Sequence, residues 1–562
     1  MQAKDPEPMT FPRVTVADWR ALVDRELAGA SFEKTLVQRT AEGLSLQPLY
    51  TEGPESPAPQ GLFVDTDRAT AFRIAMRHEA GAPVAAVDED LANGADAVWV
   101  PFSAELAERS APFWIFDAEG TLEGGELPSD QRLIWGADPL ARAARDGGPV
   151  APLEPWAAEV AAMAEAYPRA QCVRVSTLPF HDAGADAADE LAFALSTGAA
   201  YLEALLGAGL TPDAAAAQVS FQLAVGRETF NELCKVRALR VGWSKVLAAA
   251  GATQAPRPLV HAVCSSRTMS LRDPWVNLLR VTTQVFAGVL GGADLVTPLA
   301  YDAALGTASP LGHRTARNTG LVLRDESALG RVMDPAGGSY YLETLTDALA
   351  REAWRRFQAL EAEGGMAAGL DSGRIRTRLE RAWSERLEAL RKRKAPVLGV
   401  SDFANLDERV VSAGGAGHLE AAALSAGLPS HRDSEPFEAL RSRAERLALA
   451  SEAVLVALGT LAETRPRVGF AAGFFTAGGI RTREGTVEAA APLVCLCGTD
   501  ERYAAEAAER ARALKTLGVR HVLVAGRPGA LEATLREAGV DGFIHVGCDA
   551  AELLGELLEV FR

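Results

Sequence analysis

Short apolar runs alternate with Ala-rich helical stretches between about residues 70 and 345. The runs are four or five residues long and bounded by polar residues, which is typical of buried β-strands. Strand–helix alternation over this length predicts an α/β fold, a parallel (β/α)8 barrel of the TIM type. The predicted strands are 97–100, 113–116, 172–175, 259–263 and 294–297, and the predicted helices include 187–207, 213–250 and 276–290.

A second, shorter region of alternation lies near the C-terminus. It follows two long charged helical patterns and a Gly-, Ser- and Asp-rich stretch at 404–435 that is typical of a linker. About 100 residues are long enough for a core of their own, so we expect a compact doubly wound domain. Its predicted strands are 468–470, 493–497, 521–524 and 542–546, and its predicted helices are 502–516, 528–538 and 549–561.

The first helix is signalled by Thr15 and Asp18, which are spaced as in a capping box. Trp19 begins an apolar stripe at helical spacing, and this stripe must pack on the chain's own barrel or on another subunit. We therefore divide the chain into four parts. They are an N-terminal arm (1–60), a barrel with trailing helices (61–400), a linker with a helix (401–464) and the C-terminal domain (465–562).

Composition narrows the class of protein. Among 562 residues, 48% are hydrophobic and 23% charged, and Asp and Glu outnumber Lys and Arg by 74 to 57, which gives a net charge of −17. Such an acidic chain repels nucleic acid and anionic membranes, so we expect neither as a partner. The run Arg391–Lys394 is then best interpreted as cations at a helix C-terminus.

The localisation follows from two further observations. The first ten residues, MQAKDPEPMT, contain no apolar signal segment, and no apolar stretch reaches the length of a membrane span. Six scattered cysteines do not form a disulfide framework. We expect a cytoplasmic protein.

Common catalytic motifs are absent from the sequence, which has no P-loop, HExxH, GxSxG or paired CxxC. Cys495 and Cys497 share one face of an apolar strand, where buried thiols are commoner than metal ligands. The glycines at 473, 478 and 479 follow a predicted strand of the C-terminal domain, where doubly wound folds bind cofactors, but they form no specific pattern.

Residues 221–243, FQLAVGRETFNELCKVRALRVGW, resemble a conserved helix of the cobalamin-dependent methylmalonyl-CoA mutases. Further family motifs follow in the same order along the chain. The later ones are Asp334-Pro335-x-Gly337-Gly338-Ser339-Tyr340 and Leu398-Gly399-Val400-Ser401-x-Phe403, where the resemblance ends. It implies a barrel that binds an acyl-CoA, followed by a flavodoxin-like domain of the cobalamin-binding type. The earlier matching motifs are Asp273-Pro274-Trp275, Gly291-Gly292-Ala293-Asp294, Tyr301-Asp302, Ala316-Arg317-Asn318-Thr319 and Glu326-Ser327.

Three departures from the catalytic pattern stand beside this resemblance. Catalytic chains carry D-x-H-x-x-G after the first strand of the second domain, whereas the loop compared with it here, 471–479, has neither His nor Asp. Val263 stands where their barrel strand has a substrate-binding His, and His261 lies two residues earlier. Also in the barrel, Gly320 replaces a cofactor-side Gln after A-R-N-T. The third departure is Glu79, which stands at the position of the active-site Tyr of the catalytic chains.

These losses imply the non-catalytic small subunit of the two-chain bacterial enzyme. On this interpretation the large subunit is the partner, binds adenosylcobalamin and the acyl-CoA, and interconverts methylmalonyl-CoA and succinyl-CoA. We expect no catalytic, cofactor-binding or metal-binding residue on this chain, and a degenerate C-terminal domain. The matched residues then serve as framework, Asp334, Gly337 and Gly338 in a turn and Arg280 and Arg317 in ion pairs.

Two other functions stay open at this point. One is an active homo-oligomeric acyl-CoA mutase that uses His261 and binds cobalamin without a lower His. The other is an independent CoA-binding or regulatory protein, because a fold by itself does not define a function.

Overall fold

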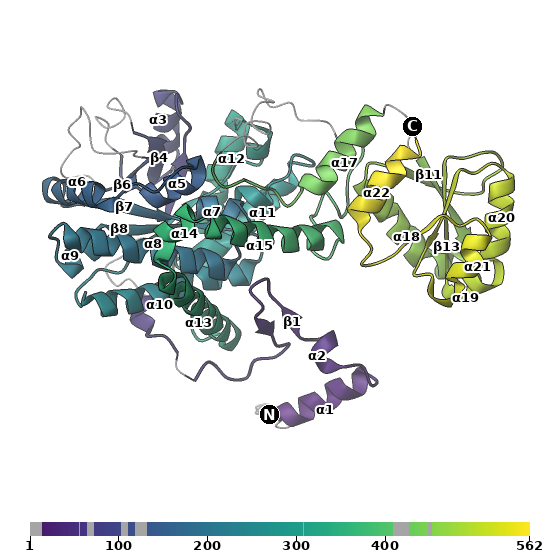
Figure 1. Ribbon diagram of the computed structural model, residues 1–562, viewed down its shortest axis with the longest axis horizontal. Coiled ribbons are helices and arrows are strands. Elements are labelled where there is room, and N and C mark those ends of the chain that lie inside the picture. The colour runs from purple at the N-terminus through teal and green to yellow at the C-terminus, as the bar shows by residue number, and fades with distance from the viewer. Residues whose placement is uncertain are drawn as a thin grey trace, which may run out of the picture.

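A computed structural model describes residues 14–55, 57–63, 72–102, 111–117, 132–306, 308–408, 426–447 and 452–561. The opening segment MQAKDPEPMT and the centre of the expected linker, 409–425, lie outside these ranges. The chain forms a barrel and a separate C-terminal sheet at opposite ends of its long axis (Figure 1). No helix within the described ranges is both long and apolar enough to cross a membrane.

The N-terminal sheet is a closed barrel of parallel strands, as the sequence predicted. Closure is made where β10 pairs with β3, with Leu295 opposite Arg73. All five predicted barrel strands are confirmed, and β3, β6 and β8 complete the set. In barrel order from β3 the strands are β3 (Arg73–Arg77), β4 (Ala97–Pro101), β5 (Trp114–Asp117), β6 (Leu133–Ala137), β7 (Ala170–Ser176), β8 (Val219–Val225), β9 (Leu259–Cys264) and β10 (Leu295–Thr297).

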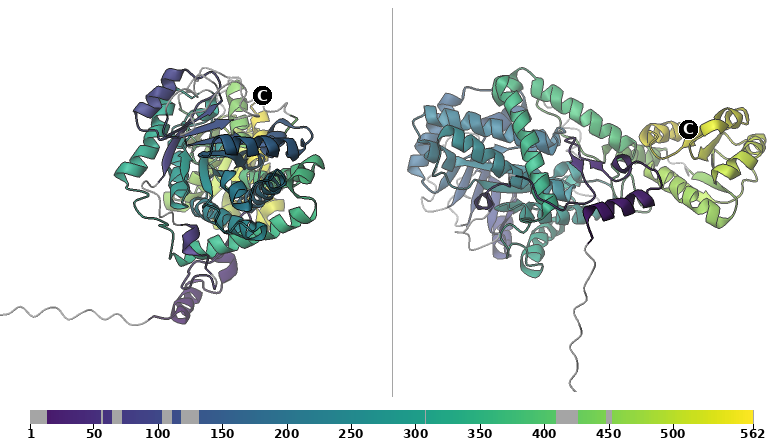
Figure 2. Two further views of the ribbon diagram at one scale, coloured as in Figure 1. Left: turned by 90° about the vertical axis from the view of Figure 1, so that its left-hand side faces the viewer. Right: turned by 90° about the horizontal axis from the view of Figure 1, so that it is seen from below.

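Helices cover the outside of this barrel (Figure 2). The predicted helices at 187–207 and 276–290 are confirmed as α8 and α11. The stretch 213–250 is not one helix, because the prediction was wrong at Val219–Val225, which form β8, a strand whose residues are all buried. The covering helices are α3 (Val84–Ala92), α5 (Pro139–Asp146), α6 (Leu153–Ala166), α7 (Leu178–Asp182), α8 (Ala187–Gly207), α9 (Pro212–Gln218), α10 (Thr229–Ala250), α11 (Val276–Leu290) and α12 (Pro310–Leu321).

Four helices lead from the barrel to the second sheet: α13 (Tyr340–Ala362), α14 (Gly365–Asp371), α15 (Arg374–Arg391) and α17 (Glu435–Arg446). The end of α15 belongs to the second domain's core, since Trp383 and Leu390 pack in the same apolar cluster as Phe437 and Leu554. The basic residues that end α15 pair within the chain, for example Arg391 with Asp549 at 2.9 Å. Arg391 therefore ties the end of α15 to the start of α22 (Ala550–Glu559), whereas Lys392 pairs with Glu388 of its own helix.

The C-terminal sheet is parallel and has the order β12-β11-β13-β14-β15, which is the flavodoxin order 2-1-3-4-5. Its helices lie on both faces, so the doubly wound prediction is confirmed (Figure 1). The elements are β11 (Glu452–Leu458), α18 (Leu461–Ala477), β12 (Arg481–Glu484), β13 (Leu493–Gly498), α19 (Asp500–Arg502), α20 (Ala508–Thr516), β14 (His521–Ala525), α21 (Glu532–Glu537), β15 (Gly542–Ile544) and α22 (Ala550–Glu559).

The first strand of this sheet was predicted in the wrong place. Residues 468–470 lie inside α18, and the strand is β11, in the segment assigned to the linker. Thr460 and Glu463 form a capping box that begins the helix. Pro466, in the second turn, has no amide hydrogen to donate to the Ala462 carbonyl. The glycines at 473, 478 and 479 therefore lie in or directly after a helix, away from the carboxyl edge of the sheet.

The N-terminal arm comprises α1 (Val16–Glu26), α2 (Phe32–Thr35) and a hairpin of β1 (Gln38–Arg39) with β2 (Ser45–Leu46). The Thr15–Asp18 capping box is confirmed. Every residue of α1 is at least partly exposed, and the helix projects from the barrel (Figure 1). Within its apolar stripe Leu22 is exposed, and Trp19, Val23 and Leu27 are half-buried.

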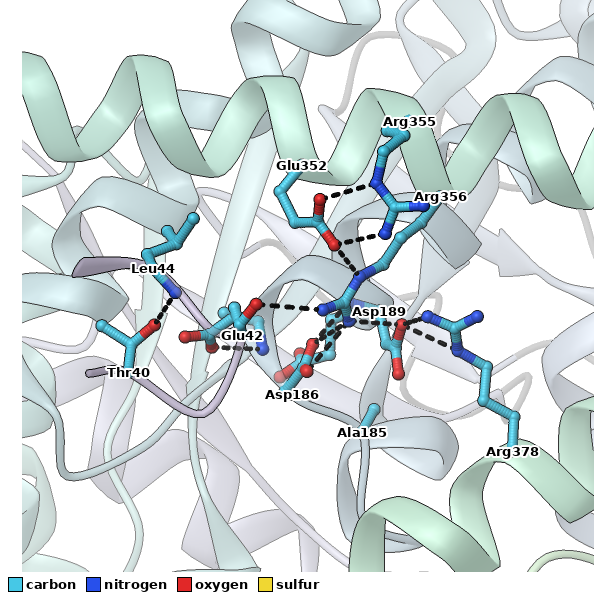
Figure 3. A network of polar contacts seen from close by, with 12 residues as sticks. Thr40, Glu42, Leu44, Ala185, Asp186, Asp189, Glu352, Arg355, Arg356 and Arg378 are labelled. Atoms are coloured by element: carbon cyan, nitrogen blue, oxygen red, sulfur yellow. Dashed lines mark hydrogen bonds and ion pairs between the residues drawn. The ribbon is translucent and has the colours of Figure 1, made fainter.

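A buried network holds the base of the arm against the barrel (Figure 3). Glu42, in the hairpin turn, accepts hydrogen bonds from the Ala187 amide and from Asn231, both at 3.0 Å. Arg356 of α13 donates to Asp186 and Asp189, at 2.7 Å each, and to the Glu42 carbonyl. The hairpin is therefore fixed to α8 and α13, while α1 extends beyond it.

Candidate functional site

A cavity of about 400 Å³ opens at the carboxyl ends of the barrel strands. This is the end at which TIM barrels place their active sites. Strand-end residues from β3, β5, β6, β7 and β9 contribute to its wall. The lining includes Arg77, Trp99, Asp117, Ala137, Asp138, Arg174, Ser176, Gln222, Val263 and Cys264.

A charged cluster around Trp99 forms one side of the cavity. The indole N–H donates to Asp117 at 2.8 Å, and Arg174 pairs with the same carboxylate oxygen at 2.7 Å. Burial disfavours the Asp117 carboxylate, but Arg174 and Trp99 outweigh it and hold its pKa below the usual value. Arg77 lies over the indole face at 4.6 Å. These contacts hold the side chains together, although the Nε of Arg174 makes no hydrogen bond among the described residues.

His261, the residue on which an active-enzyme interpretation depends, is 1% exposed. Its Nδ1 lies 3.2 Å from Gln222 Nε2 and its Nε2 lies 2.7 Å from Thr297 Oγ1. Burial, helped by the charge of Arg174, lowers the pKa of His261 to about 3. Because both ring nitrogens have partners and the ring stays neutral, His261 is not available as an acid or base at the cavity.

Val263 occupies the strand-end position where the resemblance places a substrate-binding His. It packs in a small apolar cluster with Trp99, Ile115 and Leu295. Gly320, which stands where the catalytic chains have Gln, is closely packed against β3. A Cβ at this position would lie 2.9 Å from the Ile74 side chain. Glu79, by contrast, is largely exposed and 3.4 Å from Arg77.

A fully buried polar chain runs beneath the cavity. His181 Nδ1 contacts Glu190 at 2.7 Å and its Nε2 contacts Ser265 Oγ at 2.6 Å. Lys235 pairs with the same Glu190 oxygen at 2.9 Å and with Glu232 at 2.7 Å. Burial and the charge of Arg267 lower the pKa of His181 to about 4. The sequence analysis missed this chain, since His181, Lys235 and Ser265 are far apart in sequence and match no motif.

Two carboxyl groups in the cavity wall have raised pKa values. Burial raises the pKa of Asp138 to about 6, although Tyr201 donates to it at 2.6 Å and two backbone amides also donate. Burial likewise raises the pKa of Asp182 to about 6, and Ser266 donates to it at 2.8 Å. Asp138 caps α5 and joins it to β7, so its contacts are those of a structural residue.

The switch point of the C-terminal sheet lies between β11 and β13, where flavodoxin-like folds bind cofactors. Here Gly459 and Thr460 connect β11 directly to α18. Glu463, in the first turn of α18, pairs with Arg502 at 3.1 Å, and a Cβ on Gly459 would touch both side chains. An ion pair therefore spans the crevice.

This edge does not offer a lower ligand to cobalt. The loop compared with D-x-H-x-x-G in the sequence was misplaced, because 471–477 lie inside α18. The residues that do follow β11, from Gly459 to Pro466, include neither His nor Asp. His545 follows β15, which is separated from β11 by two strands, or about 14 Å at ordinary strand spacing. The residues present do not fit the base-off, His-ligated cofactor that the resemblance implies.

The remaining sequence predictions have mixed outcomes. Cys495 and Cys497 are buried side by side on one face of β13, as expected. Arg317 forms an ion pair with Asp90 at 2.5 Å. Arg280 does not behave as predicted, because among the described residues it donates to Ser270, Asn277 and the Leu398 carbonyl and pairs with no carboxylate.

The 334–338 segment is a turn, as predicted. Asp334 has a positive φ of 47°, and its carbonyl accepts from the Gly337 amide at 2.9 Å. The Asp334 side chain pairs with the buried Arg237. These matched residues are thus framework.

A TIM-type barrel joined to a flavodoxin-like sheet, with a cavity at the barrel's carboxyl end, defines an architectural class of acyl-CoA mutases. Residues 101–456 match the family model described as methylmalonyl-CoA mutase, and the chain belongs to this family.

Similar proteins carry a more specific name. The chain is 33% identical to the methylmalonyl-CoA mutase small subunit of Streptomyces virginiae, with 98% of this chain and 97% of that protein covered. It is 34% identical to the small subunit of Propionibacterium freudenreichii subsp. shermanii, over 77% of this chain and 69% of the other. The match to the methylmalonyl-CoA mutase of Escherichia coli K12 is 33% identical but covers 42% of this chain and 33% of that protein.

Proposed function

We propose that this chain is the non-catalytic small subunit of a two-chain methylmalonyl-CoA mutase and acts in the cytoplasm. Its partner is the large subunit, which binds adenosylcobalamin and the acyl-CoA and interconverts methylmalonyl-CoA and succinyl-CoA. The cofactor supplies the radical chemistry there. This chain supplies a folded partner surface and no reacting group.

The state of His261 and Val263 carries this proposal. A catalytic barrel of this family needs a proton donor at the strand end that faces the thioester. Here that position is occupied by Val263, an apolar side chain within the barrel. The nearest imidazole, that of His261, has both ring nitrogens in hydrogen-bond contacts. An active enzyme that uses His261 is therefore disfavoured.

The C-terminal domain supports the same proposal. The crevice at its switch point is spanned by Glu463 and Arg502, and no imidazole stands at the end of β11. We infer that this chain binds no corrinoid of its own. The domain is kept as a packing unit, tied to α15 and α17 through a shared apolar core.

An exposed apolar surface is suited to the partner. Trp275, the N-cap of α11, and Leu279 within it are exposed near the 398–403 turn, where Arg280 donates to the Leu398 carbonyl. In the same turn, Phe403 is 78% exposed. Together with the partly exposed stripe of α1, this surface gives a partner chain two apolar points of attachment.

Native mass spectrometry of this chain, co-expressed with a large-subunit gene and supplied with adenosylcobalamin, tests the proposal. We expect a one-to-one pair of the two chains with one corrinoid per pair. Expressed alone, this chain should bind none. A homodimer that carries its own corrinoid and turns over methylmalonyl-CoA would overturn the assignment in favour of the active homo-oligomer.

A second candidate role rests on the cavity, which is lined by Arg77, Arg142, Arg145 and Arg174. Guanidinium groups favour an anionic ligand, so the barrel of an independent CoA-binding protein could use them for CoA phosphates. Calorimetric titration of the isolated chain with CoA separates the two roles. Micromolar binding that persists without a large subunit supports the CoA-binding role, and its absence supports the small-subunit role.

A further inference from the structure

The closure of the barrel brings together three metal-ligating side chains that the cavity does not use. His78 follows β3, Asp90 lies in α3, and His313 lies in the first half of α12. Because β10 pairs with β3, the helix after the last strand packs beside the helix after the first. Residues more than 200 positions apart in sequence thereby meet.

The ligating atoms of the three side chains converge. His313 Nε2 lies 2.6 Å from Asp90 Oδ2, and His78 Nε2 lies 3.0 Å from the same oxygen. All three atoms lie within 4.8 Å of one another. Ligand atoms around a tetrahedral zinc ion are about 3.4 Å apart, given bonds of about 2.1 Å. The two contacts to Asp90 are shorter than this, and that of His313 is a hydrogen bond, so the side chains need to separate by less than about 1 Å to admit an ion.

The imidazole of His78 is the observation that points to a ligand. Its side chain is 4% exposed, and its Nε2 has no hydrogen-bond partner among the described residues although the Asp90 oxygen is close. The ring nitrogen is thus near the oxygen without pointing at it. A buried, unsatisfied nitrogen is costly, and coordination to an ion between the three groups would satisfy it.

Asp90 is also held from its other side. Arg317, one helical turn after His313 in α12, donates to Asp90 Oδ1 at 2.5 Å. This contact leaves Oδ2 as the oxygen available to an ion. Carboxylates that bind metals are commonly held in place by such hydrogen bonds. The guanidinium charge also opposes a cation, which limits the affinity of the site.

We propose that His78, Asp90 and His313 bind a zinc-like divalent transition-metal ion that joins the β3–α3 segment to α12 at the barrel closure. Two imidazoles and one carboxylate favour zinc or cobalt over magnesium or calcium, which prefer oxygen ligands. The side chain of His313 is 26% exposed, so the ion can enter from solvent and keep water as its fourth ligand. The ion links the β3–α3 segment at the start of the barrel to α12 at its end and has no role in the mutase reaction.

Calorimetric titration of the EDTA-treated, dialysed chain with zinc chloride tests this site. We expect one ion per chain with a Kd of about 1 μM. His313→Ala should weaken binding by about 100-fold, since a third of the ligand set is lost. His313 is partly exposed, so this variant should fold, and circular dichroism without metal checks that it does.

Two control variants separate this site from adventitious binding. His545→Ala removes a partly exposed imidazole at the edge of the second sheet, and Cys548→Ser removes a partly exposed thiol. Both should bind zinc as the parent chain does. With cobalt chloride in place of zinc, the parent and both controls should show the visible absorption of a tetrahedral site, and His313→Ala should not.

The proposal is overturned if the parent chain binds no zinc at 100-fold the expected Kd, or if His313→Ala binds as tightly as the parent. Binding lost in either control would assign the ion to another site and would equally overturn it. The experiment uses this chain alone, so its outcome is independent of whether the small-subunit assignment holds.

Discussion

At the scale of single residues, the chemistry of this barrel is decided on one strand. His261 and Val263 lie two positions apart in β9 and on the same face, and the cavity is lined by the valine and not by the imidazole. Burial keeps the imidazole neutral and hydrogen-bonded within the barrel, and the valine fills an apolar layer. Other polar groups near the cavity, such as Asp117 and Asp138, are similarly committed to partners.

The buried imidazole makes barrel stability sensitive to acid. The pKa of His261 is lowered from 6.5 to about 3, so the unfolded chain takes up a proton that the folded chain refuses. Above pH 7 neither state binds this proton, so the free energy of unfolding is unaffected. As pH falls from 6.5 toward 3, protonation of the unfolded chain lowers the free energy of unfolding. Between pH 7 and pH 5 it amounts to about 2 kcal/mol.

We therefore expect the free energy of unfolding of His261→Gln to fall by about 2 kcal/mol less than that of the parent between pH 7 and pH 5. Gln can keep both neighbours hydrogen-bonded. Urea unfolding followed by tryptophan fluorescence at several pH values measures the difference. His545→Gln, at the edge of the other sheet, should behave as the parent does. Identical pH slopes for parent and His261→Gln would contradict the neutral, buried state of this ring.

At the scale of elements, the N-terminal arm has one fixed and one free part. Its hairpin is held by Glu42 and Arg356 against α8 and α13 (Figure 3). Beyond it, two side chains of α1 contact Phe32. The ring of Trp19 meets it edge-on at 6.2 Å, and the Arg20 guanidinium lies 3.6 Å from its centroid. A helix with a good capping box and a partly exposed apolar stripe is suited to packing on another chain.

Replacing Trp19 with alanine should weaken association with the large subunit by about 10-fold or more, because Trp is enriched among the side chains that dominate interface energies and this one is still partly exposed. The melting temperature of the isolated chain should not change, since α1 contributes little to its core. Analytical ultracentrifugation of mixed subunits measures the first effect and calorimetry the second. Arg25→Ala, on another face of α1, is the matched control. An equal loss of affinity in both variants would show that the apolar stripe is not the binding surface.

At the scale of the whole molecule, α15 couples the two domains. Its first half packs on the barrel, and Leu390 near its end lies in the second core. Between these, Arg386 makes two 2.6 Å hydrogen bonds to Asp433, which lies just before α17. Although burial disfavours the Asp433 carboxylate, Arg386 holds its pKa well below the usual value.

Arg386→Met should uncouple the domains, because it leaves a buried carboxylate without its strongest partner at a cost of about 3 kcal/mol. We expect the calorimetric unfolding profile to separate into a barrel transition and an earlier C-terminal transition. Arg381→Met, which removes an exposed pair with Glu385 on the same helix, should leave the profile unchanged. A single unshifted transition in Arg386→Met would show that the apolar core alone couples the domains.

Local patterns in the sequence were sufficient for most of the architecture. Alternating apolar runs located five barrel strands and the order of the two domains, and Thr15 with Asp18 located the first helix, because side-chain period and capping are local properties of the backbone. They failed at Val219–Val225, where the polar residues Ser220 and Gln222 alternate with apolar ones as in a strand but the segment was assigned to a helix. They also failed at 468–470, because three residues are too few to separate strand from helix.

Tertiary structure decided what local pattern cannot carry. Whether His261 faces a substrate or a neighbouring strand depends on which residues of β8 and β10 stand beside it. The meeting of His78, Asp90 and His313 depends on the closure of the barrel, and the ion pair of Glu463 with Arg502 on the order of strands in the second sheet. Burial, pKa and ligand geometry are set by contacts between distant segments, and those contacts exist only once the chain has folded.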